Sequence, residues 1–263
     1  MKYAVVTGAY GGMGYKTTLE LVNNGYTVFA LDKNVKDKQE NIIPIEVDVA
    51  NLESVKNAFI KVKEITDTVD TIIHFAGIYR LNSLIEIDEN EFDKICKINL
   101  YGAFYINKTF MPLLKKGSKI IITTSELAPL DPLPFTGIYA VTKGALDKYA
   151  YSLRMELQLL DISVSVIRAG AVETDMLDVS TEALNNFCNK TALYKFSSTK
   201  FKDIVYSVEA NKVPPLVIAQ KVIKIINSKN PKFINNVNRN KLLLLLNALP
   251  KRLQCYAIKK ILK

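Results

Sequence analysis

The chain has 263 residues, 49% of them hydrophobic and 23% charged, and a net charge of +9 at pH 7. These values exclude a disordered or fibrous chain and are sufficient for a sizeable core, and α/β folds of this length often form a single domain. The three cysteines are too few and too widely spaced for a disulfide framework or a metal cluster. With His74 as the single histidine, we expect no metal site.

No apolar stretch approaches the roughly 18–20 residues that a membrane span needs. The opening apolar run Tyr3–Val6 is too short for a secretory signal. Together with the unclustered cysteines, these features predict a cytoplasmic protein. The positive charge is concentrated in residues 190–263, which carry 16 Lys and Arg against 2 Asp and Glu. Such a segment fits either a solvated lysine-rich surface or contact with an anionic partner.

Short segments rich in Val and Ile alternate with segments of helical periodicity, which is typical of βαβ units around a parallel sheet covered on both faces. The expected strands are Tyr3–Thr7, Thr27–Leu31, Ile43–Val47, Thr71–Phe75, Lys119–Thr123, Ser163–Arg168 and Phe233–Asn235. The expected helices are Gly12–Asn24, Leu52–Ile65, about Glu89–Lys115, Ile138–Leu160 and Pro215–Ser228. We therefore predict an α/β fold in one domain over residues 1–263, with a doubly wound parallel sheet of about seven strands.

Two segments depart from this alternation. Residues 176–213 are polar with interspersed aromatic side chains, and they follow the sixth strand, where a substrate lid would lie. Residues 238–263 form a basic amphipathic extension that Pro250 divides into two helical pieces. One face of the second piece suits either a membrane surface or packing on the cleft or a partner subunit. Its apolar residues are Leu253, Tyr256, Ala257 and Ile261.

A glycine-rich turn follows the first strand and opens the first helix. Glycine permits a sharp turn and a close approach of the backbone to phosphate. The N-terminus of the helix then offers unpaired N–H groups and the positive end of its dipole. A glycine cluster between a strand and a helix therefore predicts a dinucleotide site. The cofactor-binding residues predicted in this turn are Gly8, Tyr10, Gly12, Met13 and Gly14.

Asp32 ends the second strand. A carboxylate at this place accepts hydrogen bonds from the adenosine ribose hydroxyls and repels a 2′-phosphate, which favours NAD over NADP. The adjacent Lys33 leaves NADP open, because a lysine can pair with the additional phosphate.

Tyr139 and Lys143 lie four residues apart on a predicted helix, so the phenol and the ammonium share one face. A free tyrosine has a pKa of about 10, and a nearby ammonium is expected to lower it toward the working range of a proton shuttle. Ser125 follows the fifth strand and can meet Tyr139 at the carboxyl edge of the sheet, where its hydroxyl would hold the substrate oxygen. A hydride cofactor beside a proton donor predicts redox chemistry between an alcohol and a carbonyl.

Together these motifs resemble the short-chain dehydrogenase/reductase family, in its single-domain form. The resemblance covers roughly residues 3–175 and implies a Rossmann-like fold. Besides the glycine turn, the matching positions are Asp48-Val49, Ala76-Gly77, Asn99, Ser125, Tyr139, Lys143 and the stretch Gly170–Thr174.

The resemblance implies a role for each matching position near the cofactor. Asp48 and Val49 would lie against the adenine ring. Ala76 and Gly77 would line the path of the cofactor. The carboxamide end would meet two further residues, Val172 and Thr174.

The resemblance also implies the catalytic set and the assembly. Asn99 would hold a helix kink and a water that link Lys143 to solvent, and Lys143 would also bond the nicotinamide ribose. Helices around 99–115 and 139–159 would form the interface of a homodimer or homotetramer.

The chain departs from the family pattern at four places, one of which is a spacing between Ser125 and Tyr139 that is one residue longer than expected. His74-Phe75 stands where the family often has two asparagines, and we expect His74 to be structural. Glu126 follows the serine, where small residues are usual. Ala169-Gly170 replaces a Pro-Gly pair.

The C-terminal leucine-rich stretch, together with Pro134-Phe135, resembles the steroid- and retinol-oxidising branch and favours a bulky apolar substrate. We therefore predict an NAD-dependent oxidoreductase acting on a secondary alcohol or ketone. In it Tyr139 shuttles the proton, Ser125 positions the oxygen and Asn99 with Lys143 supports the transfer. Two alternatives stay open: an enzyme similar to nucleotide-sugar epimerases and dehydratases, or a non-catalytic dinucleotide-binding protein whose tail binds a membrane or a partner. The basic surface lacks a nucleic-acid-binding module, so we expect no nucleic-acid partner.

Overall fold

The computed structural model describes residues 1–209 and 211–263, with the side chains of residues 175–180, 208 and 209 left out. Residue 210, within the predicted lid, lies outside this description. The strands in the described part are β1 (Lys2–Thr7), β2 (Tyr26–Asp32), β3 (Ile42–Glu46), β4 (Val69–His74), β5 (Leu114–Thr123), β6 (Ser163–Ala169) and β7 (Ile234–Val237). They form a seven-stranded parallel sheet in the order β3-β2-β1-β4-β5-β6-β7. This order confirms the predicted doubly wound α/β fold.

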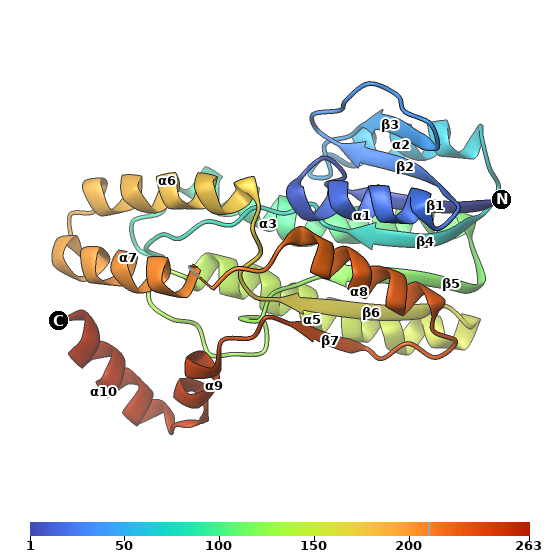
Figure 1. Ribbon diagram of the computed structural model, residues 1–263. Helices are drawn as coiled ribbons and strands as arrows, with labels where there is room; N and C mark the ends of the chain where they lie inside the picture. The colour runs from blue at the N-terminus through green and yellow to red at the C-terminus, as the bar shows by residue number, and fades with distance from the viewer. Residues whose placement is uncertain (210) are drawn as a thin grey trace.

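Helices cover both faces of the sheet (Figure 1). One layer contains α1 (Gly12–Asn23) and α8 (Pro215–Asn227), and the other contains α2 (Leu52–Lys63), α4 (Gly102–Phe110) and α5 (Gly137–Leu157). Successive residues of a strand point to opposite faces. Val5 of β1 therefore enters the layer with α2, α4 and α5, whereas Ala4 and Val6 enter the layer with α1 and α8. This double burial explains why the strands contain so many apolar residues.

The segment predicted as one helix over about 89–115 consists of four elements in the structure, and the last of them ends at Leu113. It comprises α3 (Glu89–Cys96), a π-helical turn η1 (Lys97–Tyr101), α4 and a 3₁₀ turn η2 (Met111–Leu113). Leu114 already belongs to β5, because Pro112 lacks the N–H that a continuing helix needs. The π-helical turn contains Asn99, and such turns bend a helix locally.

The predicted lid consists of α6 (Asp175–Lys190) and α7 (Lys195–Glu209), which lie together beyond the end of the sheet (Figure 1). An aromatic cluster holds them. The Phe135 ring packs at an angle against Phe187 of α6 and edge-on against Phe201 of α7, with 5.1 Å and 5.3 Å between ring centroids. Phe135 itself adopts a left-handed φ of 65°, a conformation that a bulky residue keeps only when its surroundings fix it.

The C-terminal extension forms α9 (Lys241–Ala248) and α10 (Lys251–Leu262), with Pro250 between them. Leu262 at the end of α10 joins the aromatic cluster of the lid, so the chain terminus lies against α7 (Figure 1). Within the described residues, no helix has both the length and the apolar character required to cross a membrane.

Candidate active site

A cavity of about 170 Å³ opens at the carboxyl edge of the sheet. The residues that were predicted separately from the glycine turn, the catalytic helix and the segment after β6 meet there. Those that line the cavity are Met13, Gly77, Ser125, Tyr139, Lys143, Val172 and Thr174. The remaining predicted residues lie behind this lining or farther along the strand ends.

Tyr139 lies in the first turns of α5, facing the end of β5. Its phenol is a hydrogen-bond partner of Ser125, and its ring packs edge-on against Tyr79 with 4.7 Å between ring centroids. Burial raises the pKa of Tyr139 to about 12; the hydrogen bond with Ser125 lowers it, and the nearby Glu126 carboxylate raises it. The phenol is therefore a proton donor at neutral pH.

Lys143 follows one helical turn later and is 6% exposed. Its Nζ atom donates a hydrogen bond to the backbone oxygen of Thr123 at 3.3 Å and lies 5.9 Å from the centroid of the Tyr139 ring. Burial lowers the pKa of Lys143 to about 8. The sequence-based expectation that this ammonium lowers the pKa of Tyr139 was wrong for this geometry, because removal from water dominates both groups.

Asn99 connects the π-helical turn to the segment after β4. Its Oδ1 accepts a hydrogen bond from the Ile78 N–H at 2.8 Å, and its Nδ2 donates to the Ile78 oxygen at 3.0 Å and to Thr142 Oγ1 at 3.2 Å. A Cβ atom on Gly77 would lie 3.3 Å from both Asn99 Oδ1 and Lys143 Nζ. Asn99, Gly77 and Lys143 therefore meet at one point on the floor of the cavity.

The glycine turn can take only glycine at its two tightest positions. Gly8 has a φ of 66°, and a Cβ atom there would lie 2.7 Å from the Ala76 nitrogen. A Cβ atom on Gly14 would lie 2.0 Å from the Gly8 oxygen. Gly12 begins α1 directly beneath Thr174, whose Cγ2 would meet an added Cβ at 2.6 Å. The turn is thus a compact cradle at a helix N-terminus, which fits a pyrophosphate.

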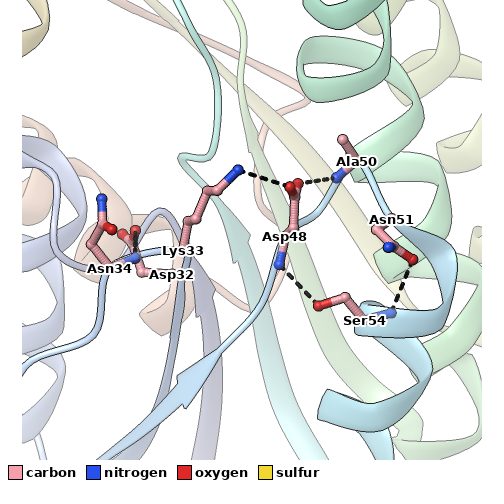
Figure 2. A network of polar contacts seen from close by, with 7 residues as sticks. All are labelled: Asp32, Lys33, Asn34, Asp48, Ala50, Asn51 and Ser54. Carbon is pink, nitrogen blue, oxygen red and sulfur yellow. Dashed lines mark hydrogen bonds and ion pairs between the residues drawn. The ribbon is translucent and has the colours of Figure 1, made fainter.

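Two carboxylates lie near this cradle, one at the end of β2 and one two residues after β3 (Figure 2). Asp32 accepts hydrogen bonds from the backbone N–H groups of Tyr10 at 2.9 Å and of Asn34 at 3.2 Å. Asp48 forms an ion pair of 3.0 Å with Lys33, in which both side chains are partly exposed. Burial alone would raise the pKa of Asp48, but the hydrogen bond from Lys33 contributes to a net lowering. Lys33 therefore already has an anionic partner.

Three further predicted cofactor positions make contacts that fix the backbone around the cavity. Val49 is 8% exposed and packs against Gly102 at the start of α4. The Ala76 N–H donates to Thr7 Oγ1 at 3.4 Å, which fixes the segment after β4 against β1. Val172 forms an isolated parallel bridge with Val213, at the base of the lid.

Several cavity residues were not found by sequence reasoning. They come from the segment after β4, from the loop before α5, from α7 and from α9, and they carry mainly apolar side chains. Those not predicted as site residues include Ile78, Tyr79, Leu127, Leu133, Thr136, Phe201, Ile204, Val205 and Leu243. No motif marks them, although the aromatic residues in the polar segment of the predicted lid, such as Phe201, were a usable signal.

Phe135 was interpreted as a hint of a bulky substrate, and its place in the structure does not support that reasoning. The side chain anchors the lid helices and is not part of the cavity lining. The apolar wall is formed instead by residues such as Phe201 and Val205 of α7 and Leu243 of α9.

His74 is 4% exposed and its Nε2 lies 2.9 Å from Asn107 Oδ1. Asn107 Nδ2 in turn donates to the Tyr149 hydroxyl at 3.2 Å. His74 is therefore tied into the layer of α4 and α5.

The parallel sheet, the glycine turn and the Ser125–Tyr139–Lys143 group are arranged as a dinucleotide-dependent oxidoreductase requires. The family model described as short chain dehydrogenase matches residues 2–185. The chain belongs to the short-chain dehydrogenase/reductase family and is an NAD(P)-dependent enzyme of that family.

Two curated relatives illustrate the extent of the similarity. The probable short-chain type dehydrogenase/reductase VdlC of Helicobacter pylori is 29% identical over 213 residues, which make up 79% of this chain and 73% of the relative. Estradiol 17-beta-dehydrogenase 2 of Mus musculus is 32% identical over 187 residues, which make up 66% of this chain but 49% of the relative.

The solved structures agree with the fold. A short chain dehydrogenase family protein from Francisella tularensis superposes with a TM-score of 0.75 at 24% identity, over 90% of this chain and 97% of the other. At this identity the likeness shows the fold alone.

Proposed function

We propose that this enzyme interconverts a bulky apolar secondary alcohol and the corresponding ketone, with NAD(H) as its cofactor. The observation that supports this most directly is the placement of the Tyr139 phenol. It lies beside Ser125, one helical turn before Lys143, at the base of a cavity with mainly apolar walls.

The chain's own residues divide the work of the reaction. A bound nicotinamide supplies or accepts the hydride. In the direction of ketone reduction, Tyr139 donates its phenolic proton to the substrate oxygen while Ser125 donates a hydrogen bond to the same atom. Lys143 places a positive charge near the resulting phenolate, and Asn99 holds the Ile78 backbone that forms the floor. In the direction of oxidation the same proton returns to Tyr139.

The preference for NAD is supported by Asp32 and by the pairing of Lys33. Asp32 ends β2 beside the cradle, where its charge disfavours a 2′-phosphate. Lys33 is the cation that would favour NADP, and it is engaged by Asp48 at 3.0 Å.

The substrate class is supported by the cavity walls. Phe201, Ile204 and Val205 of α7 and Leu243 of α9 all line the cavity. Glu126 is 7% exposed and adds a carboxyl group beside Ser125, which disfavours an anionic substrate. The similarity to a protein named estradiol 17-beta-dehydrogenase 2 is in keeping with this class.

We also propose that the enzyme forms a homodimer or homotetramer in the cytoplasm. Helices α4 and α5 expose large apolar side chains, which suits an interface between copies. They are Phe104, Val141, Tyr151 and Met155. In the described residues the thiols of the three cysteines are free, as in a reducing compartment.

The test follows the absorbance of reduced nicotinamide with NAD(H) or NADP(H) against hydroxysteroids, retinoids, sugars and short alcohols. We expect the highest kcat/KM for NAD with a hydroxysteroid or a retinoid. Tyr139→Phe should lower kcat by about 10²–10⁴-fold while NAD binding, measured by calorimetry, is retained. Near-normal turnover in Tyr139→Phe would refute the mechanism, and a preference for sugars would refute the substrate class.

A further inference from the structure

The two C-terminal helices present large apolar side chains to solvent. On α9, Leu242 and Leu245 are 74% and 67% exposed. On α10, Leu253, Tyr256 and Ile261 are 53%, 61% and 54% exposed. Leu245 follows Leu242 by three residues, Tyr256 follows Leu253 by three and Ile261 follows Leu253 by eight, so each helix carries its exposed residues on one side. We call these five residues the leucine face.

The leucine face is not needed to hold the helices in place, because other side chains do so. Leu262 of α10 is buried in the cluster of the lid. Gln254 is 5% exposed, and its Nε2 donates to the Leu249 oxygen at 2.9 Å and to Asp131 Oδ2 at 3.0 Å. These contacts fix the corner between α9 and α10 and leave the leucine face directed outward.

The segment that carries this face is strongly cationic, although one of its lysines, Lys251, pairs with Asp131 of the loop before α5. Residues 238–263 contain seven Lys and Arg and no Asp or Glu. Two copies of the same cationic face would repel each other, which argues against a symmetric contact between copies. Exposed leucines among lysines and arginines match the chemistry of an anionic phospholipid surface, where apolar side chains enter the acyl boundary and cations meet phosphates.

The leucine face also borders the active site. Leu243, next to Leu242 on α9, lines the cavity. Figure 1 shows α9 and α10 outside the layers of the sheet, on the side where the lid helices project. A flat surface could therefore approach α9 and α10 without meeting the sheet.

We propose that the leucine face of α9 and α10 docks the protein on the surface of an anionic phospholipid bilayer. Leu242, Leu245 and Tyr256 enter the interfacial region, and the surrounding cations contact the lipid phosphates. The association is peripheral and reversible, because it depends on a few side chains and on charge.

The test is co-sedimentation of the full chain with vesicles of phosphatidylcholine alone or mixed with phosphatidylglycerol. We expect binding to the mixed vesicles, weakening by about tenfold when salt rises from roughly 0.1 to 0.5 M, and little binding to phosphatidylcholine. The double variant Leu242→Ser/Leu245→Ser should bind at least about tenfold more weakly. The charge reversal Lys259→Glu/Lys260→Glu should weaken binding to the mixed vesicles as well.

The matched control is Leu159→Ser/Leu160→Ser, which removes leucines that are 82% and 54% exposed in the 3₁₀ turn η3 (Gln158–Leu160) after α5. This control should bind like the original protein. All variants should keep the original unfolding temperature, since every changed side chain is exposed. The proposal is overturned if neither vesicle binds the protein or if both leucine variants lose binding equally. It is also overturned if light scattering shows that Leu242→Ser/Leu245→Ser converts an oligomer into a monomer.

Discussion

Glu126 Oε2 accepts a hydrogen bond from the backbone N–H of Asn240 at 2.6 Å. This bond joins the residue after Ser125 to the N-cap of α9, and α9 carries the cavity residue Leu243. Burial raises the pKa of Glu126, while the hydrogen bond from Asn240 lowers it. The Glu126 carboxyl group, which departs from the family pattern, therefore holds α9 in place as a wall of the cavity.

Removing this carboxyl group should loosen that wall. Glu126→Ala leaves the Asn240 N–H without its acceptor, and we expect a loss of about 1–3 kcal/mol in the free energy of unfolding. KM should rise more than kcat falls, because Leu243 is no longer held. Thermal unfolding and steady-state kinetics measure the two effects. Glu126→Gln keeps an acceptor oxygen and is the control. Equal losses of stability in the two variants would show that the hydrogen bond to Asn240 does not hold α9 in place.

The cofactor preference should depend on the charge of Asp32. In Asp32→Asn an oxygen remains for the Tyr10 N–H, but the charge that repels a 2′-phosphate is lost. We expect kcat/KM for NADP, divided by kcat/KM for NAD, to rise roughly tenfold or more. Hydrogen bonds to charged groups are more stabilising than neutral hydrogen bonds by a free energy of this order. Lys33→Ala serves as the matched control, because it changes charge at the next residue and should leave the ratio nearly unaltered. An unchanged ratio in Asp32→Asn would mean that this residue does not read the ribose.

The rate of ketone reduction should fall above about pH 8. Burial lowers the pKa of Lys143 to about 8, so its ammonium is present below that pH and is lost above it. Tyr139, with a pKa of about 12, stays protonated through the same range. A profile of kcat/KM from roughly pH 6 to 10 should therefore be flat and then decline.

The variant that tests this assignment is Lys143→Arg, whose guanidinium stays charged across the range. Its activity should be lower, but the decline above pH 8 should disappear. Lys148→Arg, an exposed lysine on the same helix, should keep the original profile. If Lys143→Arg retained the decline, the titrating group would be another residue.

The sheet was predictable because its strands are buried on both faces and are therefore apolar throughout. β1 is one residue longer and β2 two residues longer than predicted, and each of the seven predicted strands overlaps a strand of the sheet. The start of β5 was missed because its first residues, Leu114 to Ser118, include two lysines and a glycine and have no strand pattern. The pairing of β4 with β5 shifts in register between Val69 and Thr71, and nothing in the local sequence indicates this irregular pairing.

The site was predictable where one short segment holds several of its residues, or where a residue such as Ser125 directly follows a strand of the parallel sheet. Gly8 and Gly14 share a turn, and Tyr139 and Lys143 share a helix, so spacing alone brings them together. Tyr79 and Leu243 reach the cavity through packing between distant segments, and no local pattern records that. The pKa values of Tyr139 and Lys143 could not be predicted from the sequence, because burial has a larger effect on both groups than the charge of a neighbour.

Acid should destabilise the protein through His74. Burial lowers the pKa of His74 from 6.5 to about 4, although the hydrogen bond with Asn107 opposes this change. Between these two pH values the unfolded chain binds a proton that the folded chain does not, so the free energy of unfolding decreases as pH falls. The full contribution is about 3 kcal/mol, present above pH 6.5 and lost by pH 4. Denaturant unfolding at a series of pH values measures it. His74→Asn removes the titrating ring while offering Asn107 an amide partner. Between pH 6.5 and 4 its free energy of unfolding should fall by about 3 kcal/mol less than that of the original protein. An equal fall in the two proteins would assign the acid sensitivity to other groups.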